Sequence, residues 1–115
     1  NKAIQLVSEE MNISIPEFGV TGEPFENLFA HHWYVACNDP VDSDLLIKNI
    51  DQKLIELNDD YAVERKSALK KVFITVLKEN VFMDFMSSKG KVGGQHKFPR
   101  VIKGDLLNDW KKFIA

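Results

Sequence analysis

The sequence predicts an α+β domain in which helices flank a small mixed β-sheet. Two hydrophobic patterns lead to this prediction: an apolar stripe at helical spacing over residues 46–61 and a β-branched run over residues 72–77. The length of 115 residues fits one domain, and a hydrophobic content of 44% is enough to build a core.

The N-terminal part of the chain is expected to form a helix followed by an edge strand. Residues 2–11 carry apolar side chains on one side of a helix, at Ile4, Leu6, Val7 and Met11. Residues 13–20 alternate like a strand. Pro16 favours an edge position there, because proline cannot donate a hydrogen bond to a neighbouring strand.

A loop and a second strand are expected next. Residues 21–27 include Gly22 and Pro24, which favour a loop. Residues 28–37 are expected to form a strand whose successive side chains point to opposite faces. One face carries Phe29, His31, Trp33, Val35 and Cys37, and the other carries Ala30, His32, Tyr34 and Ala36.

The longest helix is expected to begin at a cap formed by Asp42 or Ser43. Its apolar residues lie four, four, three and four positions apart, at Leu46, Ile50, Leu54, Leu57 and Tyr61. The polar run Asn58-Asp59-Asp60 is expected to weaken or break this helix.

The C-terminal half is expected to contain a strand and two helices. Residues 72–77 are typical of a strand that is buried on both faces. Asn80 is expected to cap a short helix that Gly90 closes, with Phe82, Phe85 and Met86 on its apolar side. Residues 105–114 are expected to form the last helix. The expected core residues are Trp33, Val35, Leu46, Ile50, Leu54, Val72, Ile74 and Val76.

Composition excludes several classes of protein. No apolar stretch approaches the ~20 residues of a membrane-spanning helix. The single cysteine, Cys37, excludes an intrachain disulfide framework and fits a reducing compartment such as the cytoplasm. The chain begins at Asn1 without the pattern of a signal peptide, and we expect it to be a piece of a longer protein.

The charges are distributed unevenly along the chain. Residues 1–64 carry three Lys against thirteen Asp or Glu, a net charge of −10, whereas residues 65–103 have a net charge of +8. A solvated surface usually mixes the two signs more evenly. The basic half therefore suggests an anionic ligand.

His31, His32 and Cys37 are unsuited to a shared metal site. The two histidines point to opposite faces of a regular strand, and six residues at ~3.3 Å each separate His31 from Cys37 by roughly 20 Å. Zinc ligands must converge at ~2.0–2.3 Å from the ion. We therefore expect no metal site, two histidines that belong to the sheet packing, and a core thiol at Cys37.

The aromatic residues and the basic C-terminal loop each allow two interpretations. The aromatic side chains either stack bases or fill the core, and core packing is favoured because a chain this short must bury them. Residues 87–100 contain three glycines, three lysines and one arginine, without any acid. This composition fits a mobile anion-binding loop, with residues 88–97 the most mobile, or an ordinary solvated basic loop.

Residues 89–100, Lys-Gly-Lys-Val-Gly-Gly-Gln-His-Lys-Phe-Pro-Arg, closely resemble the C-terminal motif of the auxin-responsive acyl-acid amido synthetases. These enzymes conjugate jasmonate, indole-acetate or benzoates to amino acids and belong to the acyl-adenylate-forming enzymes. Residues 57–61, Arg65-Lys66 and residues 82–89 resemble the same family, as does the strand containing His31-His32-Trp33. The Gly-Gly-Gln-His-Lys run resembles bacterial members, and Phe98 stands where Val is usual.

The resemblance implies a catalytic role for Lys97. In the wider group, a lysine on the mobile C-terminal domain, followed by an apolar residue and then Arg, enters the active site. By this resemblance, Lys97 contacts the α-phosphate and the substrate carboxylate during adenylation. The same resemblance places Gly94, Gln95 and Arg100 with Lys97 in a nucleotide- and phosphate-binding group.

The resemblance also implies the nature of the whole enzyme. Residues 1–115 would be the C-terminal lid domain of an ATP-dependent ligase that adenylates a carboxylic acid and transfers the acyl group to an amino acid. ATP and Mg would be bound mainly by an N-terminal adenylation domain, absent from this chain and its main partner, so the fragment alone would be inactive. No nucleic-acid or membrane partner is expected. The alternatives are a nucleic-acid-binding module that uses the basic half, and a purely structural interaction domain.

Overall fold

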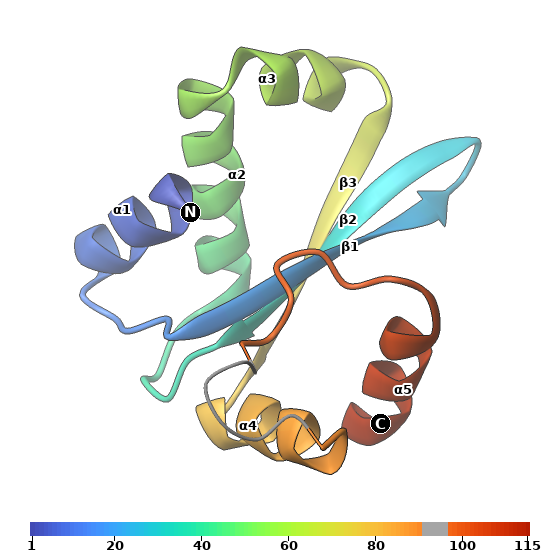
Figure 1. Ribbon diagram of the computed structural model, residues 1–115. Coiled ribbons are helices and arrows are strands. Elements are labelled where there is room, and N and C mark those ends of the chain that lie inside the picture. Colours follow the sequence, from blue (N-terminus) through green and yellow to red (C-terminus); the bar gives the residue numbers. More distant parts are fainter. Residues whose placement is uncertain (91–96) are drawn as a thin grey trace.

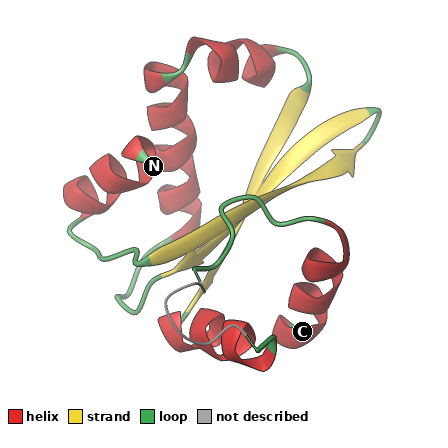
Figure 2. Cartoon of the chain, viewed as in Figure 1, coloured by secondary structure: helices red, strands yellow, loops and turns green. Residues whose placement is uncertain are grey.

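The computed structural model describes residues 1–90 and 97–115, which form a three-stranded sheet with helices on both faces (Figure 1, Figure 2). Strand β1 (Glu17–Phe25) pairs antiparallel with β2 (Leu28–Ala36), and β2 pairs in parallel with β3 (Leu69–Leu77). The strand order is β1-β2-β3. The predicted small mixed sheet is therefore confirmed, with β1 at one edge.

Strand β1 begins and ends later than the sequence indicates, since residues 13–16 precede it and form no strand. The loop predicted over residues 21–27 is wrong, because Thr21 to Phe25 continue the antiparallel pairing with β2. Only Glu26 and Asn27 separate the two strands, and Glu26 adopts a left-handed conformation with φ of 55°. Pro24 is tolerated because β1 is an edge strand.

Within residues 1–90 and 97–115, five helices cover the sheet: α1 (Lys2–Met11), α2 (Ser43–Leu57), α3 (Asp59–Lys66), α4 (Glu79–Ser88) and α5 (Gly104–Ile114). The side chain of Asp42 accepts hydrogen bonds from the backbone of Asp44 and Leu45, which confirms the predicted cap of α2. The predicted break falls at Asn58, whose side chain caps α3.

The cap of α4 differs from the prediction. Asn80 lies inside the helix, and the Glu79 N–H donates instead to the side chain of Asn38 at 2.9 Å. Asn38 lies two residues after the end of β2, and the intervening Cys37 N–H donates to the Leu77 carbonyl, so the chain leaving β2 is held where the Asn38 side chain can accept from the start of α4. Gly90 follows α4 with φ of 74°, as expected of a residue that closes a helix.

Helices α1 and α2 lie on one face of the sheet and α4 and α5 on the other (Figure 1), and a hydrophobic core lies under each pair. One face packs against α1 and α2 through Ile4, Val7, Phe18, Trp33, Val35, Leu46 and Ile50. The other face packs against α4 and α5 through Tyr34, Ala36, Phe82, Phe85, Met86, Phe98, Ile102 and Trp110. Strand β2 contributes alternate side chains to both cores, as its sequence predicts.

The predicted core is confirmed for four residues of β2 and α2. The predicted residues of β3, and Leu54 of α2, are less buried than expected, although Leu54, Ile74 and Val76 still pack against the core. Trp33, Val35, Leu46 and Ile50 are buried. Residues 72–77, including the expected core residues Val72, Ile74 and Val76, are only half-buried, as is Leu54. Strand β3 lies at an edge and, among the strands that the structure describes, pairs with β2 alone, so it keeps more contact with solvent than a central strand. None of the described helices is long and apolar enough to cross a membrane.

Leu46 and Leu54 occupy the same side of α2 but differ in burial, and this difference predicts unequal costs of truncation. Leu46 is 0% exposed, so Leu46→Ala should lower the free energy of unfolding by ~2–5 kcal/mol, whereas Leu54→Ala should cost less. Urea unfolding of both variants measures the difference. Equal losses would contradict the placement of Leu46 in the core.

Candidate functional site

Lys97 begins a segment, residues 97–102, that lies beside β1 before the chain enters α5 (Figure 1). Val101 forms a parallel bridge with Val20. The Val20 N–H donates to the Arg100 carbonyl at 2.9 Å, and the Ile102 N–H donates to the Val20 carbonyl at 3.0 Å. The segment is therefore held to the outer edge of the sheet by backbone hydrogen bonds.

Phe98 anchors this segment in the second core. Its side chain is 2% exposed. The ring centroid lies 4.9 Å from that of Phe82 and 4.7 Å from that of Trp110, both in tilted or edge-on geometry. Because burying such a ring stabilises the segment by ~2 kcal/mol or more, Phe98 fixes the chain one residue beyond Lys97.

Gly19 allows the segment to approach β1 this closely. A Cβ atom at position 19 would lie 2.6 Å from Phe98 Cε2 and 2.6 Å from the Pro99 carbonyl oxygen. Both distances are far below ordinary van der Waals contact. The position therefore requires glycine if Phe98 is to stay buried.

Glu17 bonds to the segment on both sides of Pro99. One carboxylate oxygen accepts the Phe98 N–H at 3.3 Å, and the other pairs with Arg100 Nη1. The same Nη1 donates to the Phe18 carbonyl at 3.0 Å, and Arg100 Cζ lies 4.1 Å from the centroid of the Phe18 ring. The Arg100 guanidinium is thus oriented by a carboxylate, a carbonyl and an aromatic face.

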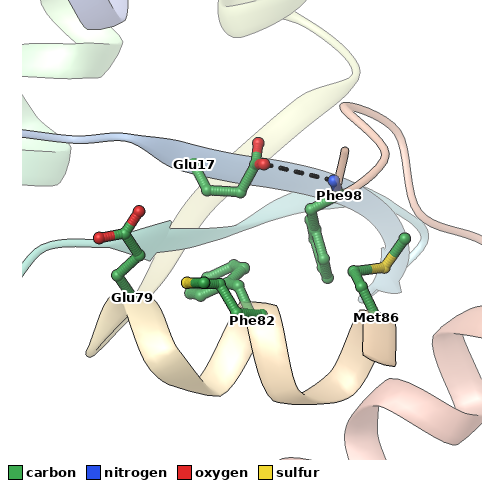
Figure 3. Close-up of a pocket in the computed structure, with 6 residues that line it drawn as sticks. Glu17, Glu79, Phe82, Met86 and Phe98 are labelled. Carbon is green, nitrogen blue, oxygen red and sulfur yellow. Dashed lines mark hydrogen bonds between the residues drawn. The ribbon is translucent and has the colours of Figure 1, made fainter. Parts of the chain in front are cut away.

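Figure 3 shows the pocket beside these contacts, lined in part by Glu17, Glu79, Phe82 and Phe98. Its volume is about 50 Å³. Pockets for drug-sized ligands are roughly 300–1,000 Å³. This pocket is too small to hold a nucleotide.

The structure brings Lys97 and Arg100, two of the four predicted site residues, onto one anchored segment. Lys97 is exposed and forms no ion pair with any other residue in the described parts of the chain. Gly94 and Gln95 lie outside the described residues. The prediction of a mobile segment over residues 88–97 also falls largely on residues 91–96, which are outside them as well.

Comparison with known proteins identifies the family. Residues 1–105 match the GH3 family C-terminal domain. The chain belongs to this family. The family resemblance seen in the sequence is confirmed, and the bacterial origin stays a prediction.

Two solved structures have the same fold as this GH3 C-terminal domain. They are AtGH3.15 acyl acid amido synthetase in complex with 2,4-DB, with 16% sequence identity, and GH3.15 acyl acid amido synthetase, with 17%. Each match has a TM-score of 0.73 and covers 96% of this chain and 22% of the solved chain. No curated protein matches the chain. The chain thus spans 22% of the length of the solved enzymes that it matches.

His31, His32 and Cys37 of this GH3 domain are packing residues. His31 and His32 lie on opposite faces of β2, where burial lowers the pKa of both. His32 Nε2 lies 2.7 Å from Thr75 Oγ1, and Cys37 is buried. Within residues 1–90 and 97–115, no three His, Cys, Asp or Glu side chains are grouped to hold a metal ion, so we assign none of them to Mg²⁺.

Of the six aromatic residues for which core packing is predicted (Phe29, Trp33, Tyr34, Phe73, Phe82 and Phe85), four lie in the two cores. Trp33, Tyr34, Phe82 and Phe85 are buried, so these rings are not exposed for stacking on bases. Phe29 and Phe73 are half-buried on the sheet. The core interpretation is therefore confirmed for the four buried rings.

A second polar cluster, formed by Asp51, Tyr61 and Arg65, was not predicted. The Asp51 carboxylate accepts the Tyr61 hydroxyl at 2.5 Å and two Arg65 nitrogens at 2.9 and 3.1 Å. Arg65 also donates to the Leu69 carbonyl at 2.7 Å. Burial, together with the hydrogen bond to Asp51, raises the pKa of Tyr61. The cluster joins α2, α3 and the start of β3, at the end of the sheet away from Glu17.

The close approach at Gly19 predicts a specific defect in Gly19→Ala. The added methyl group should displace Phe98 and Pro99 and lower the free energy of unfolding by ~1–3 kcal/mol. Hydrogen exchange should also become faster at the Ile102 amide, which bonds to β1.

Gly22→Ala is the matched control on the same strand. No heavy atom of the described chain lies within 4 Å of the Cβ position there, so this variant should be neutral or slightly stabilising. Normal stability and normal Ile102 exchange in Gly19→Ala would contradict the close packing of residues 98 and 99 on β1.

Proposed function

We propose that the chain is the lid domain of an ATP-dependent acyl acid amido synthetase and that Lys97 is its catalytic lysine. The family match supports this proposal, as does the shared fold with two acyl acid amido synthetases. Within the chain, the main observation behind the proposal is the position of Lys97: this exposed lysine directly precedes Phe98, which is deeply buried. The segment has a fixed backbone and presents a charge to solvent.

The charge of Lys97 suits the first half-reaction. The substrate carboxylate attacks the α-phosphorus of ATP, the bond from that phosphorus to the bridging oxygen breaks, and pyrophosphate leaves. The step brings two anions together, and negative charge develops on the α-phosphoryl oxygens. A lysine at ~4 Å contributes on the order of 4 kcal/mol at an effective dielectric near 20. Stabilisation that grows as the charge develops accelerates the reaction rather than only tightening binding.

A catalytic lysine on a separate, movable domain suits a reaction with two steps. The lysine approaches when the lid closes and withdraws once the acyl-adenylate has formed. The amine of an amino acid then attacks the acyl carbon, the new amide bond forms, and AMP leaves. Arg100, Gln95 and Gly94 are proposed to bind phosphate beside Lys97.

The remaining parts of the site are proposed to lie in an N-terminal adenylation domain. That domain would bind most of the ATP, the Mg²⁺ and the acyl substrate, and it would be the main partner of this chain. The chain by itself is therefore expected to form no amide. The single buried cysteine fits the reducing cytoplasm in which we expect the enzyme to work.

Replacement of Lys97 in the complete protein tests the proposal. Lys97→Ala should slow acyl-adenylate formation by ~10²–10³, the scale of losing one preorganised electrostatic contact. Carboxylate-dependent pyrophosphate exchange, with indole-acetate, jasmonate and benzoate as trial acids, measures this step. Amide formation from preformed acyl-adenylate should change much less, because the lid is expected to move before the second step.

Two control variants make the Lys97 experiment specific. Lys97→Arg should not restore the full rate, because a forked guanidinium places its charge differently from an ammonium. Lys70→Ala removes an exposed lysine from the start of β3, at the end of the sheet away from Glu17, and should leave the exchange rate unchanged. Intact exchange in Lys97→Ala would show that this lysine is not catalytic.

A further inference from the structure

Glu17 is the first residue of β1, and its carboxylate is hydrogen-bonded to the segment that carries Lys97 (Figure 3). We propose that Glu17 is a positioning residue for Lys97, acting through the backbone of residues 97–100 rather than by touching substrate. This inference rests on the proposed role of Lys97 in adenylation. It gives an acidic residue a positioning role in a domain whose expected chemistry uses the positive charges of Lys97 and Arg100.

The hydrogen bond to Phe98 acts directly on Lys97. The N–H that Glu17 accepts belongs to the peptide unit joining Lys97 to Phe98, and this unit is planar from one Cα atom to the next. The buried Phe98 ring fixes the far side of the unit, and the Glu17 carboxylate fixes its rotation. Together the two contacts determine where the Cα atom of Lys97 lies, the point from which its side chain leaves the backbone.

The ion pair between Glu17 and Arg100 is the second contact by which Glu17 holds the segment. Glu17 contacts residues 98 and 100, on either side of Pro99, whose ring restricts the backbone between them. The Glu17 side chain is 19% exposed, so these contacts are partly shielded from water. The carboxylate also balances the charge of Arg100, while Lys97 has no ion-pair partner within the described residues.

A positioning role differs measurably from a general role in stability. The backbone bridge to Val20 and the burial of Phe98 already attach the segment to the sheet. Removal of Glu17 should therefore leave the fold intact and loosen only the start of the segment. Because Glu17 acts through Lys97, its removal should have no further effect on rate once the Lys97 ammonium is gone.

The test uses the complete protein and the trial acid that gives the fastest wild-type pyrophosphate exchange. Glu17→Ala should lower kcat for exchange by ~10–10²-fold with little change in KM for ATP, the scale of a misplacement of about 1 Å. Glu17→Gln keeps a carbonyl acceptor for the Phe98 N–H and should recover most of the rate. The double variant Glu17→Ala/Lys97→Ala should be no slower than Lys97→Ala.

Glu79→Ala is the matched control, because Glu79 lines the same pocket and its side chain bonds to no residue of the described segment 97–102. It should leave the exchange rate unchanged. If the rate losses of Glu17→Ala and Lys97→Ala multiplied in the double variant, the positioning role would be overturned. An unchanged rate in Glu17→Ala would also overturn it, as would a Glu17→Gln variant as slow as Glu17→Ala.

Peptide-level hydrogen exchange separates this inference from the proposed function. In the complete protein, Glu17→Ala should speed exchange over residues 98–102 and leave α4 and α5 unchanged, with a normal urea midpoint. If the wild type shows no carboxylate-dependent exchange with any trial acid, the proposed function fails. Hydrogen exchange then still tests whether Glu17 holds the segment. In Glu17→Ala, unchanged protection over residues 98–102 would overturn this role, and faster exchange would support it.

Discussion

The burial of Phe98 against β1 is the contact on which the candidate site depends. The ring packs among Phe82, Phe85 and Trp110, and its approach to the sheet requires a glycine at position 19. One residue earlier, Lys97 is exposed. Because Lys97 and Phe98 are joined by one peptide unit, the burial of the ring limits where the exposed lysine can lie. The anchor that stabilises the segment also presents the lysine.

The two cores have different composition and support different parts of the molecule. The core under α1 and α2 is largely aliphatic, and it stabilises the sheet from the face opposite to the core that contains Phe98. The core under α4 and α5 is rich in aromatic rings and includes Phe98 and Ile102 of the candidate segment.

Ion pairs also join the acidic and basic parts of the chain, as at Glu17–Arg100 and Asp51–Arg65. The uneven charge distribution along the sequence is thus partly balanced within the fold.

Most elements were predictable because their patterns are local. The apolar stripe of α2 and its cap at Asp42 involve residues three or four positions apart, which meet on any helix. The predictions failed where a distant contact overrides the local pattern. Residues 21–25 resemble a loop but pair with β2, and the start of α4 takes its cap from Asn38, 41 residues earlier. Residues 72–77 have the composition of a buried strand, yet their place at the edge of the sheet leaves them half-exposed.

The amino-acid sequence alone determined the α+β class, most helix and strand positions, the family, and the Lys97-to-Arg100 spacing that marks the candidate site. These properties depend on the order of residues within short stretches, where periodicity, caps and motifs have direct physical meaning. Only the tertiary structure showed that Gly19 admits Phe98, and that Glu17 holds a segment 81 residues away. Nothing near Glu17 in the sequence marks its partners, because the packing of α4 and α5 on the sheet brings residues 98–100 to β1. The charge at Lys97 was therefore visible in the sequence, whereas the contacts that support it were not.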